Sequence, residues 1–222
     1  MLHPAWRFAE RSRSARLIPI STLAQKLQLK IYAHPAPELD SKNLVPVFHD
    51  WIKHHVLPEL LVDVTSYDHV PEGPKILLVG HGSDYALDEG EGRLGLLYSR
   101  KRGQLAPEAR LGDCFRRAVF AATLLEKEPR LEGKLTFRTD TFLFRINDRR
   151  LAPNQPATFE QIRPELEAFS RRLFEGGTVS LEHTGSPRQL FGVRIETTAA
   201  PPLSALLERL GGPPPPDPGQ TG

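Results

Sequence analysis

Residues 75–102, KILLVGHGSDYALDEGEGRLGLLYSRKR, indicate the fold class. Two short apolar runs, residues 76–79 and 94–98, flank a polar, glycine-bearing segment at 88–92. This pattern predicts two antiparallel strands that form a long hairpin with its tip at 88–92. Since the strands of a parallel sheet come singly and alternate with helices, strands that come in pairs indicate a largely antiparallel sheet.

The same order of elements recurs on both sides of this hairpin. Apolar residues three and four apart predict a helix after it, with Asp113 as its N-cap. Within residues 135–146 the apolar positions change from odd to even numbers, which requires a turn or bulge near 139–141 and indicates a second hairpin. Before the first hairpin, residues 26–32 alternate as a half-buried strand does. The units that result are an opening β-α-β and three β-β-α units, over residues 75–128, 135–176 and 178–210.

These units predict an α+β fold: a single, largely antiparallel sheet with helices packed on one face. The core-forming pattern covers residues 26–210, which we expect to form one domain. Residues 1–25 are rich in arginine and serine, a composition typical of a disordered leader, an upstream extension or a transit peptide. Residues 211–222 are rich in proline and glycine and predict a disordered or polyproline-like tail.

Charge and cysteine content restrict the classes of partner. Residues 1–25 carry four arginines and one glutamate, a charge of +3, which leaves −1 for residues 26–222 out of a total of +2. A domain this close to neutral lacks the basic surface of a nucleic-acid-binding protein, so we expect no nucleic-acid partner. The apolar runs are too short for a membrane span. Cys114 has no second cysteine to pair with, and its apolar helix predicts a buried thiol in a reducing, cytoplasmic compartment.

Three motifs have the form of a catalytic, cofactor or metal site without its context. Residues 80–85, GHGSDY, contain a serine but lack the second glycine and the following helix of a nucleophile elbow. Residues 90–95, GEGRLG, precede a strand instead of a helix, so a hairpin tip explains them better than a dinucleotide site. His49, Asp50 and His54 could place ligands on one helix face, but no spacing supplies a further ligand. The sequence therefore predicts no catalytic residue, metal ion or cofactor.

Basic and aromatic residues gather on the predicted hairpins. If the first two hairpins are neighbours, their arginines could hold a carboxylate or phosphate through paired hydrogen bonds. The alternative is a solvated sheet face with cross-strand pairs of arginine and aspartate. The candidate ligand-binding residues are Arg93, Arg138 and Arg145 as the anion clamp, Tyr85 and Tyr98 to orient the ligand, and His81 and Asp84 as acid–base groups.

In residues 80–101, and in the stretches FRTD at 137–140 and RINDRRLAPN at 145–154, the chain resembles a family of uncharacterised bacterial proteins. The similarity covers residues 26–197. The resemblance implies a bacterial, cytoplasmic setting and a single domain. It implies no activity, cofactor, partner or site residue.

The sequence leaves two hypotheses of function. The lack of a nucleophile–base pair and of metal-ligand spacing favours a non-enzymatic module that binds a protein partner or associates with itself. The alternative is a protein that binds, or acts on, a small anionic ligand through the Arg/Tyr cluster of adjacent hairpins. If the side chains of this cluster converge in one pocket, the second hypothesis is favoured. If they lie on opposite faces of the sheet, they cannot form one ligand site.

Overall fold

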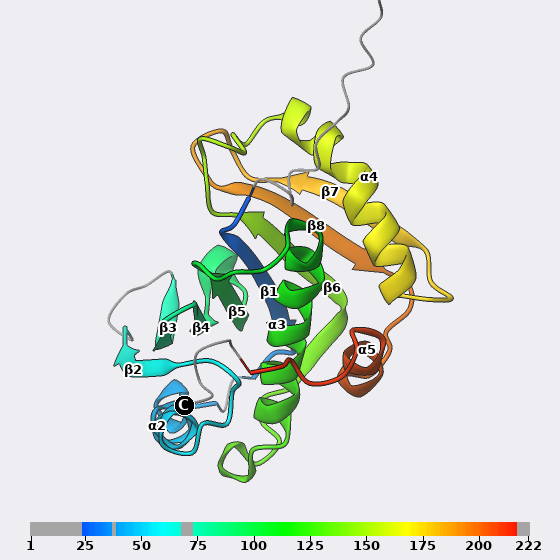
Figure 1. Ribbon diagram of the computed structural model, residues 1–222. Helices are drawn as coiled ribbons and strands as arrows, with labels where there is room; N and C mark the ends of the chain where they lie inside the picture. The colour runs from blue at the N-terminus through cyan, green and yellow to red at the C-terminus, as the bar shows by residue number, and fades with distance from the viewer. Residues whose placement is uncertain (1–23, 37–38, 68–72, 217–222) are drawn as a thin grey trace, which may run out of the picture.

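The computed structural model describes residues 24–36, 39–67 and 73–216. In these residues eight strands form one antiparallel sheet in the order β2-β3-β4-β5-β1-β6-β8-β7, accompanied by four α-helices (Figure 1). The predicted α+β fold with a single antiparallel sheet is confirmed. The strands are β1 (Leu27–Ala33), β2 (Leu61–Ser66), β3 (Pro74–Gly80), β4 (Ser83–Asp88), β5 (Gly95–Arg100), β6 (Phe137–Ile146), β7 (Val179–Thr184) and β8 (Phe191–Thr197).

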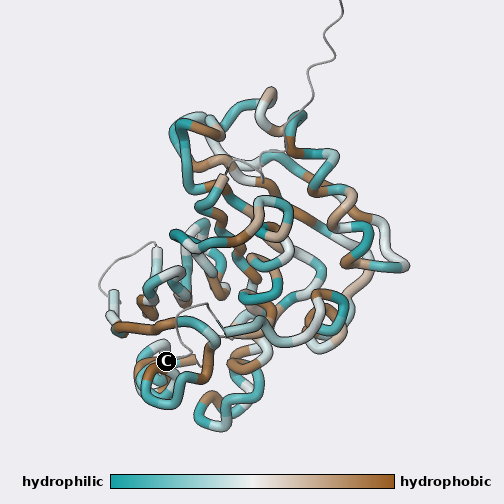
Figure 2. The backbone as a smooth tube through the Cα atoms, in the orientation of Figure 1, coloured by the Kyte–Doolittle hydropathy of each residue, from teal (hydrophilic) through white to brown (hydrophobic). Residues whose placement is uncertain are grey.

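The helices provide the second layer of the fold. Helix α3 (Arg110–Glu126) lies against β1 and β5, and α5 (Leu203–Arg209) packs on α3 (Figure 1). Helix α4 (Pro156–Leu173) lies against β7, and α2 (Leu44–Lys53) against β2. In Figure 2 the hydropathy changes every few residues along the chain, as elements with one buried face require. Among the described residues, no helix is both long and apolar enough to span a membrane.

Strand β1 lies in the middle of the sheet, between β5 and β6. Its odd-numbered side chains, Leu27, Leu29 and Ile31, pack into the hydrophobic core beneath the helices. Its even-numbered side chains Lys30 and Tyr32 are buried as well, so the prediction of a half-buried strand is wrong for this face. The end of β4 and the segment after it contact both side chains: Lys30 Nζ donates to Asp88 Oδ2 at 2.6 Å and to the carbonyl oxygen of Gly90 at 2.8 Å, and the Arg93 guanidinium lies over the Tyr32 ring.

The first predicted hairpin contains three strands instead of two. The chain reverses between β3 and β4 as well as between β4 and β5. At the first reversal, a Cβ atom on Gly80 would lie 2.5 Å from the carbonyl oxygen of Ser83. Because no side chain fits at that distance, the glycine allows the close approach that the turn requires.

The second predicted hairpin is one long strand, β6. Its register against β1 shifts between the pairs Ile31–Phe142 and Ala33–Phe137. The irregularity that the sequence predicts near 139–141 is therefore a bulge. It keeps the apolar side chains before and after it on the same face of the sheet, and the chain does not reverse. The third predicted hairpin is confirmed as β7 paired with β8.

Candidate functional site

A pocket of about 1110 Å³ opens at the end of the sheet where β4 begins and β5 ends. It is lined by the chain before β1, the connection between α2 and β2, the β3–β4 turn, the loop after β5, helix α3 and the chain after α5. These segments are far apart in sequence and meet here only in the folded protein. Its volume is slightly above the range of about 300–1,000 Å³ that is usual for small-molecule sites, so a small molecule fits within it.

Strands β4 and β5 supply the polar side chains at the sheet end of the pocket. Ser83 is the direct cross-strand partner of Arg100, and Tyr85 is the partner of Tyr98. Residues two apart on a strand share a face, so these four side chains project toward α3 together. Of these four residues, Ser83, Tyr98 and Arg100 line the pocket.

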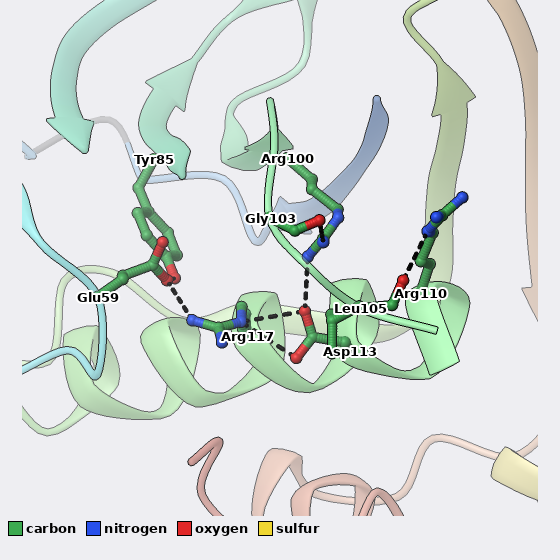
Figure 3. Close-up of polar contacts among 8 residues, drawn as sticks. All are labelled: Glu59, Tyr85, Arg100, Gly103, Leu105, Arg110, Asp113 and Arg117. Atoms are coloured by element: carbon green, nitrogen blue, oxygen red, sulfur yellow. Dashed lines mark hydrogen bonds and ion pairs between the residues drawn. The ribbon is translucent and has the colours of Figure 1, made fainter. Parts of the chain in front are cut away.

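A buried chain of ion pairs forms the wall on the α3 side (Figure 3). Arg117 Nη1 lies 3.1 Å from Glu59 Oε1, and Arg117 Nε lies 3.1 Å from Asp113 Oδ2. Arg100 Nη1 lies 3.2 Å from the same Asp113 oxygen and extends the chain to β5. Two cations and two carboxylates thus balance one another inside the protein.

Asp113 does not cap α3 as the sequence predicts. The helix begins at Arg110, so Asp113 lies within its first turn. From there its carboxylate reaches Arg100 and, one turn further along α3, Arg117. Asp113 therefore connects the helix to the sheet. Arg110, the first residue of α3, contacts the preceding loop, because its Nε donates to the carbonyl oxygen of Leu105 at 3.3 Å.

The two tyrosines of the cluster are held in their protonated form. The Tyr85 hydroxyl hydrogen-bonds to Glu59, and the ring centroids of Tyr85 and Tyr98 lie 5.1 Å apart. Burial, reinforced by the Glu59 carboxylate, raises the pKa of both tyrosines well above the ordinary value. Burial also opposes the charge of Arg117, but Glu59 and Asp113 outweigh it and raise the pKa of that guanidinium. Tyr85 and Tyr98 therefore stay neutral, and Arg117 stays charged, near neutral pH.

Two buried polar atoms of the pocket have no hydrogen-bond partner in the described part of the chain: Ser83 Oγ and Arg100 Nε. Ser83 is 2% exposed and Arg100 is 5% exposed. An unpaired buried donor costs free energy, about 1–3 kcal/mol, so native proteins rarely leave one unpaired. A bound molecule that accepts hydrogen bonds from these two atoms, on adjacent strands, would gain the most binding free energy at this part of the pocket.

The chain after α5 closes one side of the pocket. Arg116 donates to the carbonyl oxygens of Gly211 and, at 2.7 Å, of Gly212. Pro215 and Pro216 then line the pocket. Four residues of the tail that the sequence predicts to be disordered therefore contact the rest of the described chain: Gly211, Gly212, Pro215 and Pro216. Residues 217–222 and nearly all of the predicted leader, up to residue 23, lie outside the described residues.

The structure does not bring the seven candidate ligand-binding residues together. His81 and Tyr98 line the pocket, and Tyr85 packs behind Tyr98. The register places Asp84 opposite Ser99, one position away from the tyrosine pair. Because side chains alternate along a strand, Asp84 points to the other face of the sheet from the tyrosines. Arg145 lies on the same face as Asp84, since Ser99 is opposite Asp84, Gln28 is opposite Ser99, and Arg145 is opposite Gln28.

The arginines of the predicted clamp have partners of their own. The Arg93 guanidinium lies 3.9 Å from the ring centroid of Tyr32, and Arg145 pairs with Glu91. Arg138 Nη2 lies 2.8 Å from Asp140 Oδ2. On the same face as Arg145, Asp84 pairs with Lys101 at 2.6 Å. The alternative, a solvated sheet face with cross-strand pairs of arginine and aspartate, agrees with these contacts only in part, because the one pair of arginine and aspartate among them, Arg138–Asp140, lies within a single strand.

Sequence reasoning misses most of the residues that form the pocket. The GHGSDY motif presents Ser83 only as a possible nucleophile, and the structure places it at the first position of β4, with a strand instead of a helix after it. Glu59 lies in a connection without a periodic pattern, and no local signal distinguishes it. One signal is available: Asp113 and Arg117 are four residues apart, a spacing that favours an ion pair on one helix face.

The chain matches no protein-family model, and a search of curated proteins finds no match either. The resemblance to a family of uncharacterised bacterial proteins therefore stays a prediction. Among the residues that the structure describes, no group of three or more His, Cys, Asp or Glu side chains could hold a metal ion.

Proposed function

We propose that this domain binds a small molecule in the pocket where β4 begins and β5 ends. The observation that carries the proposal is the combination of a pocket of about 1110 Å³ with two buried donors of its lining residues, Ser83 Oγ and Arg100 Nε, that have no partner among the described residues. The ion pairs of the wall fix the neighbouring side chains before any ligand arrives. A site that is ordered in advance loses less entropy on binding, which favours affinity.

The proposal assigns binding and no reaction. General acid–base catalysis needs a group whose pKa lies near the working pH. Burial moves the pKa of Tyr98 upward, and the carboxylates beside Arg117 move its pKa upward too, so both are poor proton donors and acceptors at neutral pH. The charged groups of the wall are suited to orienting a ligand.

A thermal-shift screen of the full chain tests the proposal. The library contains carboxylates, phosphates, nucleotides and uncharged metabolites. A ligand that binds only the folded state at a hundredfold excess over its Kd adds about 2.7 kcal/mol to the free energy of unfolding. We expect at least one compound to raise the melting temperature.

Gln104→Trp distinguishes the pocket from other sites. Gln104 lines the pocket but is exposed, so an indole at this position fills part of the opening without entering the core. Gln161→Trp, at an exposed position of α4 outside the pocket lining, is the matched control. We expect Gln104→Trp to abolish the shift and Gln161→Trp to retain it. A library without hits, or hits that Gln104→Trp leaves unchanged, would refute the proposal.

A second candidate function is association through strand β2. It is supported by two large apolar side chains that are exposed at this end of the sheet, Leu60 (49%) and Val62 (60%). An edge strand with exposed apolar residues can pair with another chain. If copies associate through this edge, Val62→Lys should reduce the mass measured by light scattering at high protein concentration. Leu151→Lys, at another exposed apolar residue, should leave it unchanged. A wild-type chain that is monomeric at every concentration would exclude self-association.

A further inference from the structure

Ser83 and Arg100 form a pair with a defined geometry. They are direct cross-strand partners on β4 and β5, which places their Cβ atoms about 5 Å apart on the same face. Ser83 Oγ and Arg100 Nε are the two pocket atoms that are buried without a hydrogen-bond partner in the described residues. Both atoms carry a hydrogen that can be donated. The pair therefore has two unsatisfied donors on directly paired residues of β4 and β5, both of which line the pocket.

The orientation of the Arg100 guanidinium is fixed by its other nitrogens. Nη1 contacts Asp113 Oδ2 at 3.2 Å, and Nη2 donates to the carbonyl oxygen of Gly103 at 3.3 Å. Gly103 has a φ of +136° and a Cβ at this position would lie 3.0 Å from Nη2, so the loop needs glycine to make this contact. With both terminal nitrogens engaged, Nε is left for a partner that the described chain does not supply.

The charge around the pair favours an anion. In the buried wall the two arginines balance Glu59 and Asp113. Arg102 adds a further positive charge at the exposed side of the pocket, where its Nε donates to the carbonyl oxygen of His81 at 2.7 Å. Among the described residues, the lining thus carries one more Arg than Asp and Glu together, before the histidines are considered. A group with a single negative charge would neutralise this excess.

We infer that Ser83 and Arg100 form a seat for a carboxylate carried by the ligand of this pocket. The two carboxylate oxygens match the two donors in number, and its single charge matches the excess of one. A phosphate has more oxygens and up to two charges, and it would leave acceptors unpaired at this pair. The inference rests on the proposed function and names the class of ligand.

Binding of paired probes to the full chain tests the seat. The probes are benzoate and succinate, their neutral counterparts benzamide and succinamide, and inorganic phosphate, measured by ligand-observed NMR at millimolar concentration. We expect the carboxylates to bind and the amides to bind at least tenfold more weakly. A charged hydrogen bond stabilises binding enough that Ser83→Ala should weaken carboxylate binding about 10- to 100-fold.

Two further variants keep the result interpretable. Arg100→Lys retains the positive charge but removes the Nε donor, and it should weaken carboxylate binding similarly. Ser170→Ala is the control, because Ser170 Oγ in α4 is also buried and without a hydrogen-bond partner in the described chain but lies outside the pocket lining. Since Ser83 Oγ has no partner to lose among the described residues, Ser83→Ala should also leave the melting temperature of the unliganded protein unchanged or raise it.

The outcomes separate the seat from the pocket. If carboxylates bind and Gln104→Trp abolishes this, but Ser83→Ala and Arg100→Lys do not weaken it, the pocket binds ligands and the seat is refuted. Binding of amides or phosphate in preference to carboxylates, sensitive to Gln104→Trp, also refutes the seat and retains the pocket. If no probe binds, the seat is refuted, and the broader screen then decides the proposed function alone.

Discussion

Replacing Glu59 with alanine is expected to lower the free energy of unfolding by about 3–5 kcal/mol, because it removes one of the carboxylates that pair with the buried Arg117. Glu59 is 1% exposed, so its ion pair with Arg117 is shielded from solvent in the folded chain. The substitution also removes the acceptor of the Tyr85 hydroxyl. Urea unfolding followed by circular dichroism measures the loss.

Two comparisons control this prediction. Glu182→Ala removes an exposed carboxylate that lies 2.6 Å from Arg194, and it should cost less than about 1 kcal/mol, as exposed ion pairs do. The double variant Glu59→Leu, Arg117→Met removes both charges and should recover part of the loss, since replacing a whole buried pair with apolar residues is often nearly neutral. A loss below about 1 kcal/mol for Glu59→Ala would show that this ion pair contributes little to stability.

Replacing Asp88 with alanine is the second large effect that we expect, again about 3–5 kcal/mol at neutral pH. Asp88 is the carboxylate partner of Lys30 on the opposite face of the sheet, at 2.6 Å, and both are buried. In the described chain, Lys30 Nζ has two hydrogen-bond acceptors, Asp88 Oδ2 and the carbonyl oxygen of Gly90. Without Asp88 it keeps only the second. Chemical unfolding at several pH values measures the difference from wild type.

The pH dependence of this second loss identifies its cause. Burial, partly offset by Asp88, lowers the pKa of Lys30 below 10.5. Between that lowered value and the ordinary one, the unfolded chain binds more protons than the folded chain, so stability rises with pH. Removing Asp88 lowers the pKa of Lys30 further and widens this range toward neutral pH. The deficit of Asp88→Ala should therefore shrink as the pH rises toward the ordinary pKa of lysine, about 10; a deficit that is constant or grows would contradict the assignment to Lys30.

Strands whose pairing is local can be predicted from the sequence. The β7–β8 hairpin is predicted correctly because its two apolar runs are close together and separated by a glycine-containing turn. Strand β4 is not, because its end residues Ser83 and Asp88 are polar and resemble turn residues. Ser83 lies opposite Arg100, and Asp88 accepts a hydrogen bond from Lys30. Both neighbours come from other strands, and local patterns contain no information about them.

The class of fold and the positions of most helices follow from the sequence alone, because periodic apolar residues must face a common core whatever the strand order. Which side chains share a site becomes clear only in the folded chain. Strand β1 enters the sheet between β5 and β6, and Glu59, Ser83, Arg100 and Arg117 meet from four separate segments. A strand's pleat determines the face on which each side chain lies, but the neighbours on that face depend on the order and register of the strands, which long-range packing sets.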